Sequence, residues 1–133
     1  MAKRIVIVGG VAAGASAAAK ARRTGEDFEV VLLEAGPYIS FANCGLPYYV
    51  GGEIAKREDL FVVTAEQFAR RFGIDVRVRC RATAVDPDAQ TVTCAGENGD
   101  SEELSYDRLV LATGTVGVVP PIEGLRRPNM FTL

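Results

Sequence analysis

The sequence predicts an α/β fold, in which a parallel sheet flanked by helices carries an additional antiparallel β-meander. The first observation is the β-branched run Lys3–Val8, which lacks polar alternation and is typical of a strand buried on both faces of a parallel sheet. The second is a glycine-rich turn and a helical segment that connect this run to another apolar run, Phe28–Leu33. The third is a series of short strand patterns between residues 75 and 106, separated by turn sequences.

The N-terminal part forms one βαβ unit. The turn Gly9-Gly10-Val11-Ala12-Ala13-Gly14 follows the first strand, a helix is expected over Ala15–Arg23, and Gly25 ends it. The second strand ends at Glu34. Because a crossover of this kind joins parallel strands, we expect the strands of residues 3–8 and 28–33 to be parallel.

The remaining elements follow from capping and turn signals. Pro47 suits the first turn of a short helix that Gly51-Gly52 would end. Thr64-Ala65-Glu66-Gln67 has the form of a capping box, and apolar residues at helical spacing continue from it to Gly73. Strands are then expected at 75–78, 82–85, 91–94, 103–106 and 109–112, and three prolines make the last part a loop.

Composition excludes several classes of function. The chain has 133 residues, of which 48% are hydrophobic and 24% charged, which suits one globular domain with a core. A formal net charge of -2 offers no basic surface for nucleic acid, and no apolar run approaches the ~20 residues of a membrane helix. Three cysteines without a secretory signal argue against a disulfide framework, and the lack of histidine leaves no basis for a metal site. We expect a soluble, cytoplasmic protein.

The glycine-rich turn has most features of a dinucleotide-binding fingerprint. Gly9 and Gly14 stand where the tight bend and the close packing of helix and strand need glycine, whereas Val11 stands in the middle position. Phosphates would then rest on backbone N–H groups and the helix N-terminus. Glu34, at the end of the second strand, is placed to accept hydrogen bonds from a ribose hydroxyl. The alternative is a structural turn with a surface glutamate, but the flanking strand and helix favour a nucleotide.

Cys44 is the candidate nucleophile. Its neighbours Asn43 and Gly45, and the helix expected after them, favour a thiolate at this position. No second cysteine follows within a few residues, so the oxidised form would be a sulfenic acid, a persulfide or a mixed disulfide with a small thiol. The alternative is a buried cysteine without chemical function.

Without any family resemblance, two other groups of residues are interpreted as structural. Cys80 and Cys94 lie within strand patterns, with nothing polar arranged about them. Lys20, Arg22 and Arg23 crowd the last turn of the first helix, where cations complement the helix dipole.

A family resemblance is carried by the segments Gly9–Gly14, Ser40–Tyr49 and Tyr106–Gly114. They closely resemble the N-terminal part of the coenzyme A-disulfide reductases. Single-cysteine relatives of these enzymes, the NADH oxidases, peroxidases and CoA-dependent persulfide reductases, share much of this pattern. The resemblance implies a Rossmann-like FAD-binding domain, incomplete at its C-terminus, from an enzyme in which NAD(P)H reduces FAD and electrons then pass to a single cysteine.

The resemblance also implies functions for individual residues. Cys44 would be the redox nucleophile, and FAD would be bound by Gly9, Gly14, Glu34, Thr113 and Gly114. CoA would be contacted by Ser16, Lys20, Arg23, Ser40 and Asn43. At the position of another basic CoA contact this chain has Phe72, and Arg71 lies next to it. Gly117 stands where many relatives have proline.

Members of this family are longer than the present chain. They continue through an NAD(P)H domain, a second FAD segment and a dimerisation domain. We therefore expect residues 1–114 to be the first segment of an FAD-binding domain and residues 115–133 to be the crossover towards an NAD(P)H domain. Alone, the chain is expected to be an inactive fragment that holds FAD poorly.

The implied function is NAD(P)H-driven, FAD-dependent reduction of CoA disulfide or CoA persulfide by a homodimeric enzyme. One alternative is an NADH oxidase or peroxidase that uses Cys44 as a sulfenic acid. An alternative of another class is a non-catalytic nucleotide-binding or thiol-sensing module.

Overall fold

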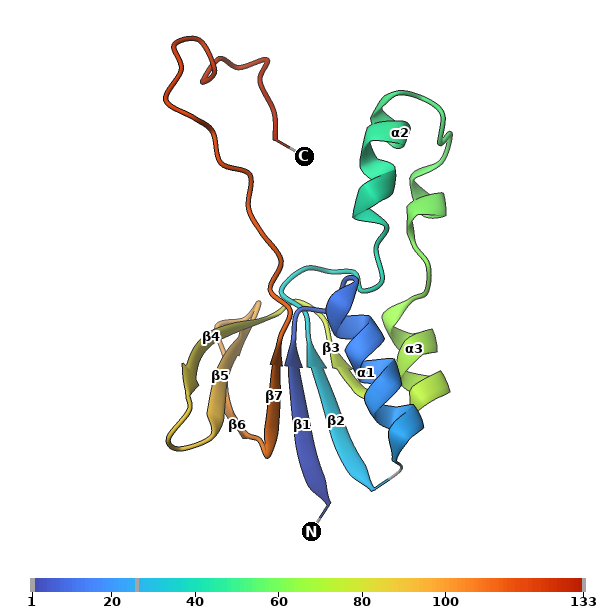
Figure 1. Ribbon diagram of the computed structural model, residues 1–133, viewed down its shortest axis with the longest axis vertical. Helices are drawn as coiled ribbons and strands as arrows, with labels where there is room; N and C mark the ends of the chain where they lie inside the picture. The colour runs from blue at the N-terminus through green and yellow to red at the C-terminus, as the bar shows by residue number, and fades with distance from the viewer. Residues whose placement is uncertain (1, 26, 133) are drawn as a thin grey trace.

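The computed structural model describes residues 2–25 and 27–132 and confirms the α/β fold (Figure 1). The parallel sheet has the strand order β3-β2-β1-β7, with β1 (Lys3–Val8), β2 (Phe28–Leu33), β3 (Asp75–Arg77) and β7 (Arg108–Leu111). The antiparallel sheet has the order β4-β5-β6, with β4 (Cys80–Asp86), β5 (Thr91–Gly96) and β6 (Ser101–Ser105). The helices are α1 (Ala13–Thr24), α2 (Leu46–Val50) and α3 (Ala65–Phe72), with 3-10 turns η1 (Asn43–Gly45) and η2 (Arg57–Leu60).

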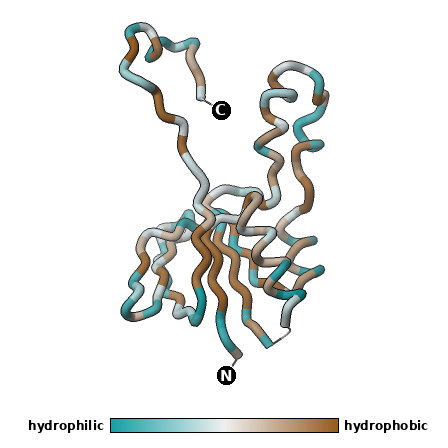
Figure 2. The backbone as a smooth tube through the Cα atoms, in the orientation of Figure 1, coloured by the Kyte–Doolittle hydropathy of each residue, from teal (hydrophilic) through white to brown (hydrophobic). Residues whose placement is uncertain are grey.

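The parallel sheet is the middle layer of three. One face packs against α1 and α3, through Ile7, Val30, Leu32, Ala15, Ala18 and Phe68. The other face packs against the antiparallel sheet, through Val6, Val8, Val31, Leu33, Val92, Cys94 and Leu104. Because successive residues of a strand point to opposite faces and both faces are covered, the central strands are apolar along most of their length (Figure 2).

The helix boundaries follow the sequence signals closely. α1 begins at Ala13, two residues before the expected start at Ala15. The capping box of α3 is confirmed, since Thr64 Oγ1 accepts from the Gln67 N–H at 3.2 Å and Gln67 Oε1 accepts from the Thr64 N–H at 3.3 Å. Gly73 ends α3 in the left-handed conformation, with φ 59°. None of the helices in the described residues is long and apolar enough to cross a membrane.

The carboxyl ends of β1 and β7 lie side by side at the point where the strand order reverses. The chain leaves β1 for β2 on one side, while β7 pairs with β1 on the other. Such a switch point in a parallel sheet is where ligands usually bind. The segment containing α2 and the C-terminal segment both project from this end of the sheet (Figure 1).

Candidate functional site

A cavity of about 370 Å³ lies at this switch point. Its lining includes Gly9, Glu34, Thr113 and Gly114, which are residues predicted for the cofactor. Gly14, the other predicted residue, is outside the lining and packs behind it: a Cβ on Gly14 would lie 1.6 Å from the carbonyl oxygen of Gly9. Gly9 itself has φ +98°, and a Cβ there would lie 2.1 Å from the Ala112 carbonyl oxygen. Both glycines are therefore required by backbone contacts at the turn.

Glu34 joins the glycine-rich turn to the end of β2. Its Oε2 accepts from the Gly10 N–H and its Oε1 accepts from the Gly36 N–H, each at 2.7 Å. A carboxylate oxygen has two lone pairs, so each oxygen can accept one further hydrogen bond. The side chain is half-buried at the cavity and can still accept from a hydroxyl of a bound ribose. The structure thus adds Gly10, which sequence reasoning missed, as the residue that orients this carboxylate.

The N-terminus of α1 is open to an anion. Within residues 2–25, the N-cap residue Ala12 makes no side-chain capping hydrogen bond, and the first turn of α1 contains no acidic residue. The first backbone N–H groups of a helix have no partner inside the helix, and the helix dipole favours negative charge there. A diphosphate is the kind of group that suits this end of the helix.

A second cavity, a groove of about 580 Å³, contains the candidate nucleophile. Cys44 and Ser40 lie in it with Ser16 and Arg23 of α1 and with Arg71 at the end of α3. Apolar residues line the rest: Val11, Ala12, Ala15, Ala19, Phe41, Ala42, Val62, Val63, Phe68 and Phe72. The groove therefore combines one thiol, two guanidinium groups and an apolar wall.

Consecutive residues of the turn η1 line different cavities. Asn43 lines the switch-point cavity, whereas Cys44, the next residue, lines the groove. Cys44 is exposed and lies before the first residue of α2, Leu46. A group bound at the switch point and a molecule in the groove would therefore lie on either side of this turn.

Ser40 is held in an unusual backbone conformation at the groove. Its φ is 49°, in the left-handed region that few non-glycine residues adopt. Its N–H donates to the Gly10 carbonyl at 3.0 Å, and its carbonyl accepts from the Val62 N–H at 3.1 Å. Strain of this kind persists where the surroundings impose it and is frequent at functional sites.

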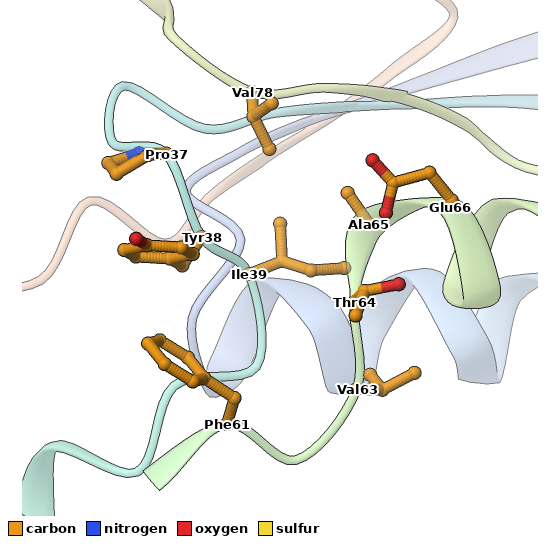
Figure 3. Close-up of a pocket in the computed structure, with 9 residues that line it drawn as sticks. All are labelled: Pro37, Tyr38, Ile39, Phe61, Val63, Thr64, Ala65, Glu66 and Val78. Atoms are coloured by element: carbon orange, nitrogen blue, oxygen red, sulfur yellow. The ribbon is translucent and has the colours of Figure 1, made fainter. Parts of the chain in front are cut away.

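A third cavity, of about 250 Å³, is lined in part by residues 37–39, which directly precede Ser40 in the chain. The rings of Tyr38 and Phe61 border it, with Ile39 between them and the start of α3 (Figure 3). Their centroids are 4.5 Å apart, and the Arg57 guanidinium lies 5.4 Å from the Tyr38 ring. The cavity contains neither a thiol nor a cation among its lining residues, so we interpret these aromatic contacts as support for the loop that carries Ser40 and Cys44.

The structure does not bring all of the residues predicted for CoA into one place. Ser16, Arg23 and Ser40 line the groove, and so does Arg71. Asn43 instead lines the switch-point cavity, and Lys20 is exposed on α1 and is absent from the groove lining.

The two strand cysteines are not as isolated as the sequence suggested. Cys80 lines the switch-point cavity, and both Cys80 and Cys94 line another open cavity beside it. Burial, and after it the neighbouring Cys80 thiol, raises the pKa of Cys94 to about 11. In the part of the chain that the structure describes, no group of three or more His, Cys, Asp or Glu residues is arranged to hold a metal ion.

We expect the three thiols to be alkylated in the order Cys44, Cys80, Cys94. Cys44 is exposed, Cys80 is partly buried and Cys94 is 2% exposed. Because the thiolate is the reacting form, the raised pKa of Cys94 slows it further at neutral pH, by about tenfold or more. Timed labelling of the folded chain with iodoacetamide, followed by peptide mass spectrometry, measures the order. Faster labelling of either strand cysteine than of Cys44 would contradict it.

Comparison with known proteins identifies the family. The sequence pattern described as Pyridine nucleotide-disulphide oxidoreductase matches residues 3–133. The chain belongs to this family. It is 34% identical over 128 residues to an NADH oxidase of Methanocaldococcus jannaschii, covering 96% of this chain and 29% of that protein. It is 36% identical over 113 residues to a coenzyme A disulfide reductase of Staphylococcus haemolyticus, covering 84% of this chain and 26% of that protein.

Solved structures give the same result. The crystal structure of reduced CoADR-RHD from Bacillus anthracis superimposes with a TM-score of 0.88 and 43% identity, over 92% of this chain and 22% of that one. The chain thus spans less than a third of the length of these relatives. The resemblance inferred from the three sequence segments is confirmed, as is the Rossmann-like fold.

Proposed function

We propose that the protein containing this chain is an FAD-dependent enzyme that uses NAD(P)H to reduce CoA disulfide or CoA persulfide through Cys44. The observation that carries this proposal is the position of Cys44, on a turn between a dinucleotide-type cavity and a groove with guanidinium groups. Residues 1–114 would be the first segment of the FAD-binding domain, and residues 115–133 would lead towards an NAD(P)H domain. We further propose that the complete enzyme is a cytoplasmic homodimer.

The switch-point cavity suits FAD. The uncapped N-terminus of α1 and the turn at Gly9 and Gly14 would hold the diphosphate, and Glu34 would accept from the ribose. Thr113 and Gly114 would contact the cofactor from the end of β7. When bound, FAD would supply the transfer of two electrons from NAD(P)H towards the Cys44 thiol. Asn43 lines this cavity, so we assign it to the cofactor side of the turn rather than to CoA.

The groove suits CoA. It runs beside α1 from Ala12 to Arg23, a span of about 16 Å at 1.5 Å per residue. A thiol joined by a long arm to a phosphorylated nucleotide is a molecule of this form. Arg23 and Arg71 would bind its phosphates, Ser16 and Ser40 would hydrogen-bond the arm, and the exposed Lys20 would add positive charge nearby.

Cys44 would carry out the thiol chemistry. Its thiolate would attack one sulfur of the CoA disulfide, forming a mixed disulfide and releasing the first CoA as a thiolate. Electrons from the cofactor side would then reduce the mixed disulfide and release the second CoA. With a persulfide substrate, the same thiolate would attack the outer sulfur, breaking the S–S bond and releasing CoA as a thiolate, and two electrons would then release the transferred sulfur from Cys44 as sulfide.

The alternative enzyme is an NADH oxidase or peroxidase in which Cys44 cycles through a sulfenic acid. The exposure of Cys44 favours it, since a small oxidant could reach the thiol without any groove. The guanidinium groups beside the apolar wall favour the CoA enzyme, because neither oxygen nor a peroxide needs them. A non-catalytic nucleotide-binding or thiol-sensing module would bind a nucleotide but would not turn over.

We expect Cys44→Ser to abolish disulfide reduction in the complete enzyme and to leave reduction of the flavin by NAD(P)H unchanged. Serine keeps the size of the side chain but is a poor nucleophile towards disulfides and cannot form the mixed disulfide. Steady-state reduction of CoA disulfide and stopped-flow absorbance of the flavin measure the two steps separately. CoA disulfide reduction by the serine variant at the wild-type rate would exclude the proposed function.

A further inference from the structure

Cys80 and Cys94 form a thiol pair that the proposed function does not use. Cys80 is the first residue of β4, and Cys94 lies in the middle of β5. In the antiparallel register Cys80 faces Gly96 and Cys94 faces Ala82, so the two cysteines are diagonal neighbours on the same face of the sheet. Both cysteines line one open cavity of about 440 Å³.

One member of the pair, Cys80, also borders the switch-point cavity. Cys80 lines that cavity together with Gly9 and Glu34. Its backbone N–H donates to the Glu34 carbonyl at 3.0 Å, which fixes the start of β4 above the end of β2. Cys80 is partly buried and lines two cavities, whereas Cys94 is 2% exposed, so Cys80 is the more accessible of the two.

We propose that Cys80 and Cys94 are a second redox couple of this chain, which the disulfide of a low-molecular-weight thiol oxidises to an intramolecular disulfide. The Cys80 thiol loses its proton, and its sulfur attacks one sulfur of the small disulfide, which forms a mixed disulfide and releases one small thiolate. The Cys94 sulfur then attacks the Cys80 sulfur, breaks the mixed disulfide and releases the second small thiolate. The two cysteines lose two protons and two electrons, and the small disulfide becomes two thiols.

The positions of the two cysteines determine which of them reacts first and how readily their disulfide is reduced. Cys80 reacts first because it is the accessible member, and Cys94 completes the bond slowly because burial keeps it protonated. Diagonal neighbours are further apart than the usual spacing of a disulfide, so the bond requires a local shift of β4 relative to β5. Strained disulfides are readily reduced, and the couple is therefore reversible.

The test uses the Cys44→Ser chain, so that only the pair can react, with cystamine as the small disulfide. We expect a product lighter than the starting chain by two hydrogens, which yields a peptide cross-linked through Cys80 and Cys94 and which dithiothreitol returns to the dithiol. A cystamine adduct that persists on Cys80, or no reaction under conditions where the chain stays folded, would overturn the proposal.

A matched pair of variants in the same background tests the order of the steps. Cys94→Ala should stop the reaction at the mixed disulfide, so that the adduct accumulates on Cys80. Cys80→Ser, a change at a half-buried position, should leave Cys94 unmodified over the same time. Modification of Cys94 in the Cys80→Ser chain at the parental rate would show that Cys80 is not the point of attack and would also overturn the proposal.

Discussion

Gly14→Ala is expected to destabilise the chain severely. The new Cβ would lie 1.6 Å from the carbonyl oxygen and 2.8 Å from the carbonyl carbon of Gly9, and both of these are backbone atoms that no rotamer change can move. To relieve this clash, α1 must shift relative to the turn after β1, and this shift weakens the packing between the helix and the sheet. Overpacking usually costs about 1–3 kcal/mol. Because this clash is with backbone atoms, we expect Gly14→Ala to lower the free energy of unfolding by at least ~3 kcal/mol.

The midpoint of urea unfolding, followed by circular dichroism, measures this effect. Gly96→Ala is the matched control, because a Cβ on Gly96 has no neighbour within 4 Å and Gly96 is not among the positive-φ glycines. The free energy of unfolding of this control should stay within ~0.5 kcal/mol of that of the parent chain. If Gly14→Ala were as stable as the control, the close contact at the glycine-rich turn would not exist in solution.

Replacing both Arg23 and Arg71 with alanine is expected to raise the Michaelis constant for CoA disulfide in the complete enzyme by about tenfold or more. Both side chains line the groove and are exposed before substrate binds. A charge-assisted hydrogen bond to phosphate is worth ~1.5–3 kcal/mol, and solvent screening reduces this at exposed positions. Two contacts at about half that value still exceed the ~1.4 kcal/mol that corresponds to a tenfold change.

Two comparisons separate phosphate binding from a general loss of positive charge. Pantethine, the disulfide of the CoA arm without phosphates or nucleotide, should show an unchanged Michaelis constant in the double variant. Arg70→Ala removes a similar exposed cation from α3, but Arg70 is absent from the groove lining, so it should leave both substrates unaffected. Equal changes for CoA disulfide and pantethine would favour the NADH oxidase or peroxidase alternative.

The sequence was sufficient for the elements and the cofactor turn because the signals there are local. The apolar runs of β1 and β2 predict strands covered on both faces, and the order of strand, glycine turn and helix predicts the switch-point cavity. The capping box gave the start of α3 because its two hydrogen bonds involve residues three positions apart.

The details of the site were not predictable because they depend on contacts between distant segments. Asn43 and Cys44 line different cavities, and that division depends on the loop path that starts from the left-handed Ser40. The contact between Cys80 and Cys94 depends on the register of β4 with β5, which shifts between Ala82 and Ala84. Irregular register of this kind leaves no trace in the alternation of apolar residues.

If Cys44 lies in a groove that binds CoA, this thiol should form a mixed disulfide with CoA disulfide faster than with a similar disulfide that lacks phosphates. The folded chain would be mixed with a low concentration of CoA disulfide or of pantethine, and the adduct on the Cys44 peptide would be followed by mass spectrometry. We predict that CoA disulfide reacts at least about tenfold faster and that salt reduces its advantage, because charge attraction to the arginines is screened. Equal rates for the two disulfides at low salt would show that the groove does not select CoA.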